Sequence, residues 1–164
     1  MDLLIVRHAI AFETDANRWP DDRKRPLTAE GAARARQAAK GLKRLVDRPQ
    51  CLLTSPLTRA KQTAAILTEF ARWPAALDCP ALSPGESAEA ALEALRAKSH
   101  SLVVVVGHQP GLGKLIAAST GTGRPRTFDL KKFGAAFLSF NGSPRAGHAV
   151  LRWLLAPSIL RALR

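Results

Sequence analysis

Short hydrophobic runs alternate along this chain with longer segments in which apolar residues recur at helical spacing. Three runs predict buried strands, at residues 2–6, 51–54 and 101–106. The third run contains four consecutive valines, and such a β-branched run is typical of a strand covered on both faces. Four segments predict helices, at residues 28–47, 55–73, 86–98 and 110–120. Thr28 suits the N-cap of the first helix, and Ser55 and Pro56 suit the N-cap and first residue of the second.

The pattern changes after residue 120. Residues 135–140 and 148–155 predict two strands joined by a turn through Asn141-Gly142, and residues 157–164 predict a short closing helix. Strands that alternate with helices indicate a parallel sheet covered by helices, to which the last two strands would add antiparallel members. The predicted fold class is therefore α/β, a three-layer α/β/α sandwich with a mostly parallel central sheet. A length of 164 residues fits one domain spanning residues 1–164.

The formal net charge of +12 is unusual for a chain with 46% hydrophobic residues. The excess lies in two regions: residues 18–48 hold ten Lys and Arg against four acidic residues, and residues 124–164 hold eight against one. One interpretation is attraction of an anionic partner, such as a phosphate ester, an acidic protein or nucleic acid. The other is a solvated surface without a function. Aromatic residues make up only 5% of the chain, which disfavours nucleic acid.

The sequence gives no signal for a membrane or for secretion. The apolar N-terminal stretch is too short for a signal peptide and lacks a basic region before it. No stretch approaches the roughly 20 apolar residues of a membrane helix. Cys51 and Cys79 form no CxxC pair, and two unpaired thiols fit a reducing compartment. The expected location is therefore the cytoplasm.

Polar residues that could carry chemistry follow the predicted strands. Arg7-His8 ends the first strand, Arg59 lies in the helix after the second, and His108 ends the valine strand. The Arg-His pair alone fits either a strand that reaches water or a strand that holds a nucleophile and a cation at a site. Because ligands of open α/β sheets bind beyond the carboxyl ends of the strands, these side chains can meet there. With two helix N-termini at the same edge, at Ser55 and Pro110, they would suit an anion with several oxygens, most simply phosphate.

Four short motifs in this order carry a resemblance: "VRHAI", "RPLTAEG", "SPLTRAKQTA" and "VVGHQP". Together they resemble motifs of the histidine phosphatase superfamily, the phosphoglycerate mutase-like phosphatases, and most of all its small prokaryotic phosphohistidine phosphatase branch. The resemblance implies a phosphoglycerate mutase-like fold and no cofactor. It also implies that His8 is a nucleophile that becomes transiently phosphorylated. Arg7, Arg59 and His108 would then hold the phosphoryl oxygens, and Arg25 would lie at the rim. One position departs from the family, since Ala9 replaces the usual glycine.

The acid that would protonate the leaving group is not evident. The resemblance implies a carboxylic acid in the stretch that contains Glu86, but Glu86 also fits a carboxylate in the first turn of a helix. Asp21 and Asp22 are the other candidates, and both also fit solvated loop residues. An alkoxide is a poor leaving group, because its parent hydroxyl has a pKa near that of water, about 15.7. A phosphorylated imidazole leaves far more readily, since the free ring has a pKa of about 6.5. A site without a strong acid therefore favours a P–N over a P–O bond.

The sequence thus predicts a metal-independent phosphatase that forms a phosphohistidine intermediate on His8. The preferred substrate is phosphohistidine on a signalling protein, such as a histidine-containing phosphotransfer domain. Two alternatives stay open: a phosphatase for small phosphate esters, and a non-catalytic module that binds phosphate or nucleic acid. No cluster of His, Cys, Asp and Glu with metal-ligand spacing is present in the sequence.

Overall fold

The computed structural model describes residues 1–163 and centres on a six-stranded sheet with the order β3-β2-β4-β1-β5-β6. The strands are β1 (Asp2–Arg7), β2 (Cys51–Thr54), β3 (Ala76–Asp78), β4 (Leu102–Gly107), β5 (Ala135–Phe140) and β6 (Ala149–Leu155). The first four strands in this order pair in parallel, whereas β5 is antiparallel to both β1 and β6. The predicted mostly parallel sheet with antiparallel members near the C-terminus is therefore confirmed.

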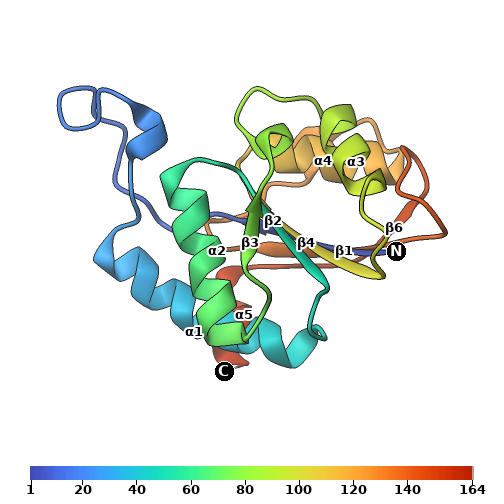
Figure 1. Cartoon of the computed structure of the whole chain (residues 1–164), viewed down its shortest axis with the longest axis horizontal. Helices are drawn as coiled ribbons and strands as arrows, with labels where there is room; N and C mark the ends of the chain where they lie inside the picture. Colours follow the sequence, from blue (N-terminus) through green and yellow to red (C-terminus); the bar gives the residue numbers. More distant parts are fainter. Residues whose placement is uncertain (164) are drawn as a thin grey trace.

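Helices cover both faces of this sheet, which gives the three predicted layers (Figure 1). The α-helices are α1 (Ala29–Leu45), α2 (Thr58–Ala71), α3 (Ala88–Arg96), α4 (Gly111–Thr120) and α5 (Pro157–Ala162). Three 3-10 turns are η1 (Asp22–Lys24), η2 (Pro80–Leu82) and η3 (Pro125–Thr127). Alternate residues of β1 enter the two cores: Leu4 and Val6 pack with α1 and α2, and Leu3 and Ile5 pack with α3 and α4. This alternation is what a strand buried on both faces requires.

Two predicted helix starts were wrong by a few residues. Helix α2 begins at Thr58 instead of Ser55, its N-cap position is Leu57, and no side chain caps it. The hydroxyl of Ser55 instead contacts the ring of His108. Helix α3 begins at Ala88 after the N-cap Ser87, so Glu86 precedes the helix. By contrast, the predicted N-cap Thr28 is confirmed, since its hydroxyl accepts a hydrogen bond from Gly31 N at 2.9 Å. Arg164, the last residue of the predicted closing helix, lies outside the described residues.

Helices α1 and α5 approach each other closely at Gly41. A Cβ atom at this position would overlap the backbone carbonyl oxygen of Leu160. The helices could accommodate it only by moving apart, because a backbone carbonyl cannot rotate away as a side chain can. We therefore expect Gly41→Ala to lower the free energy of unfolding by roughly 1–3 kcal/mol, measured by urea titration. Gly111→Ala is the matched control, since nothing lies within 4 Å of its Cβ position, and an equal loss in both variants would contradict the explanation.

Among residues 1–163, no helix is long and apolar enough to cross a membrane.

Candidate active site

The register of β1 and β4 brings two histidines together. Arg7 pairs with Gly107 across the two parallel strands, so the next residue of each strand, His8 and His108, lie side by side. The backbone N–H of His8 donates to Gly107 O at 3.0 Å and extends the ladder by one bond. The two ring centroids are 4.9 Å apart and the rings are tilted by 53°. Both residues are buried, with 5% and 4% of their surface exposed.

Two arginines approach the same edge of the sheet. Arg7 ends β1 and donates from Nη1 to Leu130 O at 2.6 Å, which fixes its side chain against the loop before β5. Arg59 lies in the first turn of α2 and is buried. Both guanidinium groups are close enough to His108 to lower the pKa of its ring. The structure therefore places all four residues predicted for the site, two imidazoles and two guanidiniums, around one region.

The ring of His8 is held in one tautomer. Its Nδ1 lies 2.7 Å from the backbone oxygen of Ala9, and because a carbonyl can only accept, Nδ1 carries the proton and Nε2 keeps a lone pair. Burial, together with the nearby His108, Lys132 and Arg59, lowers the pKa of His8 to about 2, although the Ala9 hydrogen bond acts in the opposite direction. The ring is therefore neutral at pH 7, which is the form a nucleophile needs.

His108 is oriented by Ser55. Its Nε2 lies 2.8 Å from Ser55 Oγ, and that oxygen also accepts from the backbone N–H of Leu57 at 3.4 Å. With the Leu57 N–H donating to it, the serine hydroxyl can donate its own proton to Nε2, so that Nδ1 of the neutral ring carries a hydrogen. Burial, followed by the charge of Arg59, lowers the pKa of His108 to about 3. In this tautomer the neutral ring of His108 is a hydrogen-bond donor at Nδ1.

Three nitrogen atoms of this cluster are buried and have no hydrogen-bond partner among the described residues: Arg7 Nε, Arg59 Nε and His108 Nδ1. Each can donate, and a buried donor without a partner costs about 1–3 kcal/mol. An anion with several oxygens would satisfy donors of this kind, and Arg matches phosphate geometry in particular.

Arg25 joins the cluster through an acidic residue. It is 8% exposed, and its Nε donates to Asp22 Oδ1 at 2.6 Å. Asp22 also contacts Arg59. Arg59 Nη1 donates to the backbone oxygen of Asp22 at 2.9 Å, and Arg59 Nη2 lies 3.1 Å from Asp22 Oδ2. The short turn η1 therefore holds Arg25 and Arg59 in fixed positions relative to each other.

Comparisons with known proteins agree with this geometry. A family model described as the histidine phosphatase superfamily (branch 1) matches residues 3–79. An uncharacterised protein from Picosynechococcus sp. is 36% identical over 137 residues, which cover 82% of each chain. The chain belongs to the histidine phosphatase superfamily. It is a phosphatase, and its substrates carry phosphate.

Within the histidine phosphatase superfamily, the chain is similar to SixA proteins over nearly its full length. Phosphohistidine phosphatase SixA from Escherichia coli is 28% identical over 165 aligned positions, which cover 98% of this chain and 97% of SixA. A structure of the protein histidine phosphatase SixA complexed with tungstate has a TM-score of 0.84 at 27% identity, covering 98% of this chain and 99% of that chain. The predicted family, its SixA-like branch and the phosphoglycerate mutase-like fold are therefore confirmed.

The three candidate acids of this histidine phosphatase lie in different settings. Asp22 is not a solvated loop residue: its hydrogen bond from Arg25 holds the pKa of its carboxyl below the ordinary value, which makes it a poor proton donor. Asp21 accepts from the backbone N–H of Arg23 at 3.0 Å and caps η1. Glu86 is exposed, and it lines, together with His108, a crevice of only about 10 Å³.

The sequence interpretation missed Lys132 as a member of the histidine phosphatase site. Burial lowers the pKa of this half-buried ammonium, and the charges of Arg7 and Arg25 lower it further. Its neighbour Phe133 donates from its backbone N–H to both Arg7 O and His8 O at 3.2 Å, so the two segments lie side by side. Lys132 stands alone in a loop far from every motif, and only the fold reveals its position.

Ala9 does not strain the backbone of the histidine phosphatase. The non-glycine residues with positive φ in the described chain are Arg72 and Phe133, so Ala9 does not require the conformation that glycine favours. Its N–H donates to Thr63 Oγ1 at 3.0 Å. Among residues 1–163, no group of three or more His, Cys, Asp or Glu side chains is placed to hold a metal ion.

The depressed histidine pKa values predict how stability depends on pH. In the unfolded chain both rings titrate near pH 6.5, whereas in the folded protein His8 titrates near 2 and His108 near 3. Below pH 6.5 the unfolded state binds protons that the folded state does not, so the free energy of unfolding decreases as the pH falls. We expect the Tm to decrease from pH 7 to pH 5, and His108→Asn to reduce this decrease. The exposed His100→Asn is the control, and an unchanged slope in His108→Asn would contradict the assignment.

Proposed function

We propose that the protein hydrolyses phosphohistidine on a signalling protein, through a covalent phosphohistidine formed on Nε2 of His8 and without a metal ion. Arg7, Arg59 and His108 bind the phosphoryl oxygens, and Arg25 lies at the rim of the site. The main support for the proposal is a cluster of three buried nitrogens, Arg7 Nε, Arg59 Nε and His108 Nδ1, that have no hydrogen-bond partner within residues 1–163. They lie near the neutral imidazole of His8, whose Nε2 keeps its lone pair.

The proposed reaction has two steps, phosphoryl transfer to His8 and hydrolysis of the phosphorylated His8. Nε2 of His8 attacks phosphorus and the bond from phosphorus to the substrate nitrogen breaks. That nitrogen leaves with the bonding pair, and because the other nitrogen of the substrate ring carries a proton, the group that leaves is a neutral imidazole. Water then attacks phosphorus, the bond to Nε2 breaks, and phosphate is released while His8 returns to its neutral form. The guanidinium groups and Nδ1–H of His108 stabilise the charge that develops on the equatorial oxygens.

The setting of the acidic residues favours a P–N substrate over a P–O substrate. Asp22 is held ionised by two arginines, Asp21 caps a turn, and Glu86 is exposed in a loop. An imidazole that leaves with a proton on its other ring nitrogen has a conjugate acid with a pKa of about 6.5 and needs little help from an acid, whereas a leaving alkoxide needs much more. The similarity to SixA, which is named a phosphohistidine phosphatase, supports the same substrate class.

The experiment compares kcat/KM for a histidine-phosphorylated phosphotransfer domain with kcat/KM for simple alkyl phosphomonoesters. We expect a clear preference for the phosphoprotein, and turnover that is unchanged by EDTA. A preference for the monoesters would contradict the substrate class and favour a small-molecule phosphatase. Loss of activity in EDTA that returns with a divalent cation would contradict metal independence.

A further inference from the structure

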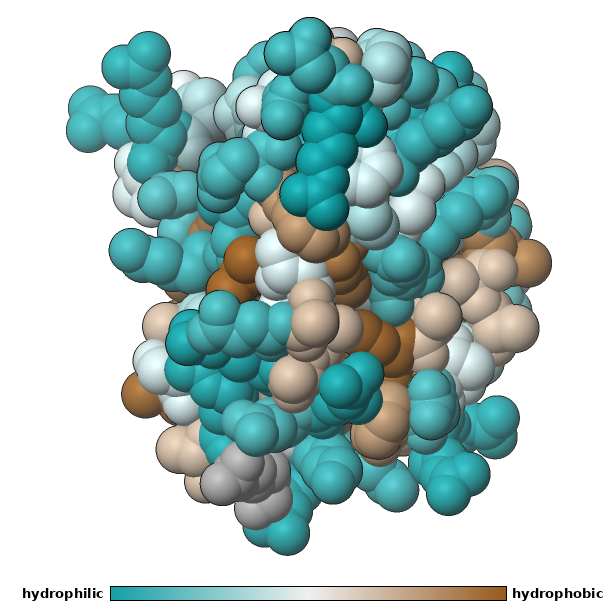
Figure 2. All heavy atoms as spheres, turned by 90° about the vertical axis from the view of Figure 1, so that its left-hand side faces the viewer, coloured by the Kyte–Doolittle hydropathy of each residue, from teal (hydrophilic) through white to brown (hydrophobic). Residues whose placement is uncertain are grey.

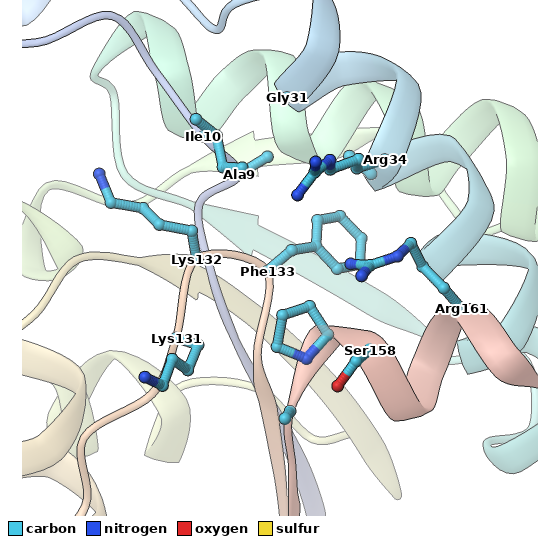
Figure 3. Close-up of a pocket in the computed structure, with 12 residues that line it drawn as sticks. Ala9, Ile10, Gly31, Arg34, Lys131, Lys132, Phe133, Ser158 and Arg161 are labelled. Atoms are coloured by element: carbon cyan, nitrogen blue, oxygen red, sulfur yellow. The ribbon is translucent and has the colours of Figure 1, made fainter.

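A cavity of about 350 Å³ lies beside the phosphoryl site and is not used by the proposed mechanism. It lies between the start of α1, the loop before β5 and the start of α5, and Ala9 joins it to the neighbouring His8. We call it the Phe133 pocket, after the ring that forms its wall (Figure 3). Its volume exceeds that of a phosphoryl group and falls in the range of sites that hold part of a larger ligand.

The Phe133 pocket is strongly cationic. Arg34 from α1 and Arg161 from α5 point toward the same space beside the Phe133 ring (Figure 3), and the stems of Lys131 and Lys132 form the opposite wall. No Asp or Glu is among the residues that line it. Arg34 pairs with Glu30 outside the pocket through one nitrogen, and because a guanidinium has five N–H donors, Arg34 keeps further donors for a ligand.

The two basic regions of the sequence meet here. Arg34 belongs to the basic region 18–48 and Arg161 to the basic region 124–164, and the packing of α1 on α5 brings them together. Figure 2 views the molecule from the side where the parallel strands end, and it shows hydrophobic residues in the middle of a mostly hydrophilic face. Part of the +12 charge is therefore concentrated around an apolar pocket next to the catalytic cluster instead of being spread over the surface.

The wall of the Phe133 pocket is held in a strained conformation. Phe133 has a φ of 62°, which is unusual for a bulky residue and costs about 1–3 kcal/mol. Its backbone N–H donates to the carbonyl oxygens of Arg7 and His8, so the strand end that carries His8 also holds the backbone of Phe133. Such strain persists where the surroundings impose it, and it is concentrated at binding sites. The pocket and the phosphoryl site are therefore linked through the backbone hydrogen bonds of Phe133.

We infer that the Phe133 pocket binds an Asp or Glu side chain that lies near the phosphohistidine of the substrate protein, an inference that rests on the proposed function. The carboxylate contacts the guanidiniums of Arg34 and Arg161, and its methylene groups pack on Phe133 and Pro157. The pocket is thus a specificity site that selects phosphoproteins with an acidic residue next to the phosphorylated histidine. Arginine suits this role because its planar fork pairs with a carboxylate through two hydrogen bonds.

The test uses two peptides that carry a non-hydrolysable triazole analogue of phosphohistidine, one flanked by Asp and Glu and the other by Asn and Gln. Calorimetry of the full chain is expected to show about tenfold tighter binding of the acidic peptide. In Arg34→Gln/Arg161→Gln the ratio of the two dissociation constants falls to about one, while the affinity for inorganic phosphate stays unchanged. Arg36→Gln/Arg152→Gln is the matched control, because it removes the same charge from exposed positions outside the pocket and keeps the preference.

The inference would be overturned by equal binding of both peptides by the wild type, by a preference that survives Arg34→Gln/Arg161→Gln, or by a preference lost equally in the control. Tighter binding of a small carboxylated ester such as phosphoserine, lost in the pocket variant while the peptides bind equally, would also overturn it and assign the pocket to a small molecule. Hydrolysis of authentic phosphohistidine is measured separately. If the acidic peptide binds more tightly but phosphohistidine is not hydrolysed, the proposed function is wrong. If phosphohistidine is hydrolysed but the two peptides bind equally, the role inferred for the Phe133 pocket is wrong.

Discussion

Replacing His8 with alanine is expected to abolish turnover, with a loss of about 10⁴-fold or more in kcat. The reason is that the covalent route needs a lone pair at Nε2, and alanine offers no other nucleophile there. The fold should survive, because a neutral buried ring is removed and no charge is left unpaired. The measurement is the rate of phosphate release at saturating substrate. A second measurement is trapping of labelled phosphoenzyme by rapid quenching in base, where phosphohistidine persists.

His100→Ala is the control, because His100 is exposed and lies before β4, at the opposite end of the strand from His108. It should retain wild-type turnover and phosphoenzyme. Substantial turnover in His8→Ala, or a labelled phosphoenzyme in that variant, would rule out His8 as the nucleophile. A wild-type protein without any turnover on phosphohistidine or phosphomonoesters would favour the non-catalytic binding module. Nucleic-acid binding by such a module would appear in a filter-binding titration as affinity that decreases steeply with salt.

Most of the fold was predictable because its strands are short, apolar and separated by helices of clear period. The valines of β4 predicted a strand covered on both faces, and the order of the elements predicted a parallel sheet. The meeting of His8 with His108 was predictable as well, since both follow parallel strands. What the sequence could not supply was the register, Arg7 opposite Gly107, that makes these two rings direct neighbours.

The errors at Ser55 and Asp22 share a physical cause, which is competition between local and long-range partners. Ser55 followed by Pro56 is a good local signal for a helix start. In the fold, its hydroxyl contacts His108, which is 53 residues away, and α2 begins three residues later. Asp22 is a similar case, since its two arginine partners include Arg59, 37 residues further along the chain. The single domain spanning residues 1–164 and the cytoplasmic location stay predictions.

The cations of the site serve two purposes that a local pattern does not reveal. Without substrate, burial and the surrounding charges keep His8 and His108 neutral, which suits the proposed roles of a nucleophile and a neutral donor. When a phosphoryl group binds, the same guanidiniums are positioned to offset its charge. A site that held His8 as an imidazolium would bind phosphate well but could not attack it, because the lone pair of Nε2 would be occupied. Burial and the neighbouring cations, which keep the histidines neutral, therefore make strong phosphate binding compatible with a reactive imidazole.

Replacing Arg59 is expected to have the second largest effect. Arg59→Gln should lower kcat/KM by roughly 10²–10³-fold, the usual loss when one donor to a developing oxyanion is removed. Arg59→Lys keeps the charge but loses the planar fork, which Arg59 needs to reach Asp22 and a phosphoryl oxygen at once. We therefore expect the lysine variant to recover only a small part of the lost rate. The measurement is steady-state kinetics on a histidine-phosphorylated protein.

A double-mutant cycle with Asp22→Asn separates the two contacts of Arg59. If Asp22 acts by positioning Arg59, its removal lowers kcat/KM in the wild type but has little further effect in Arg59→Gln, so the two losses are not additive. Lys61→Gln is the control on the same helix, since Lys61 is exposed and its ammonium contacts Asp78 at 2.7 Å. Wild-type kinetics in Arg59→Gln would mean that the guanidinium of Arg59 does not contact the reacting group. Fully additive losses with Asp22→Asn would mean that Asp22 does not act by positioning Arg59.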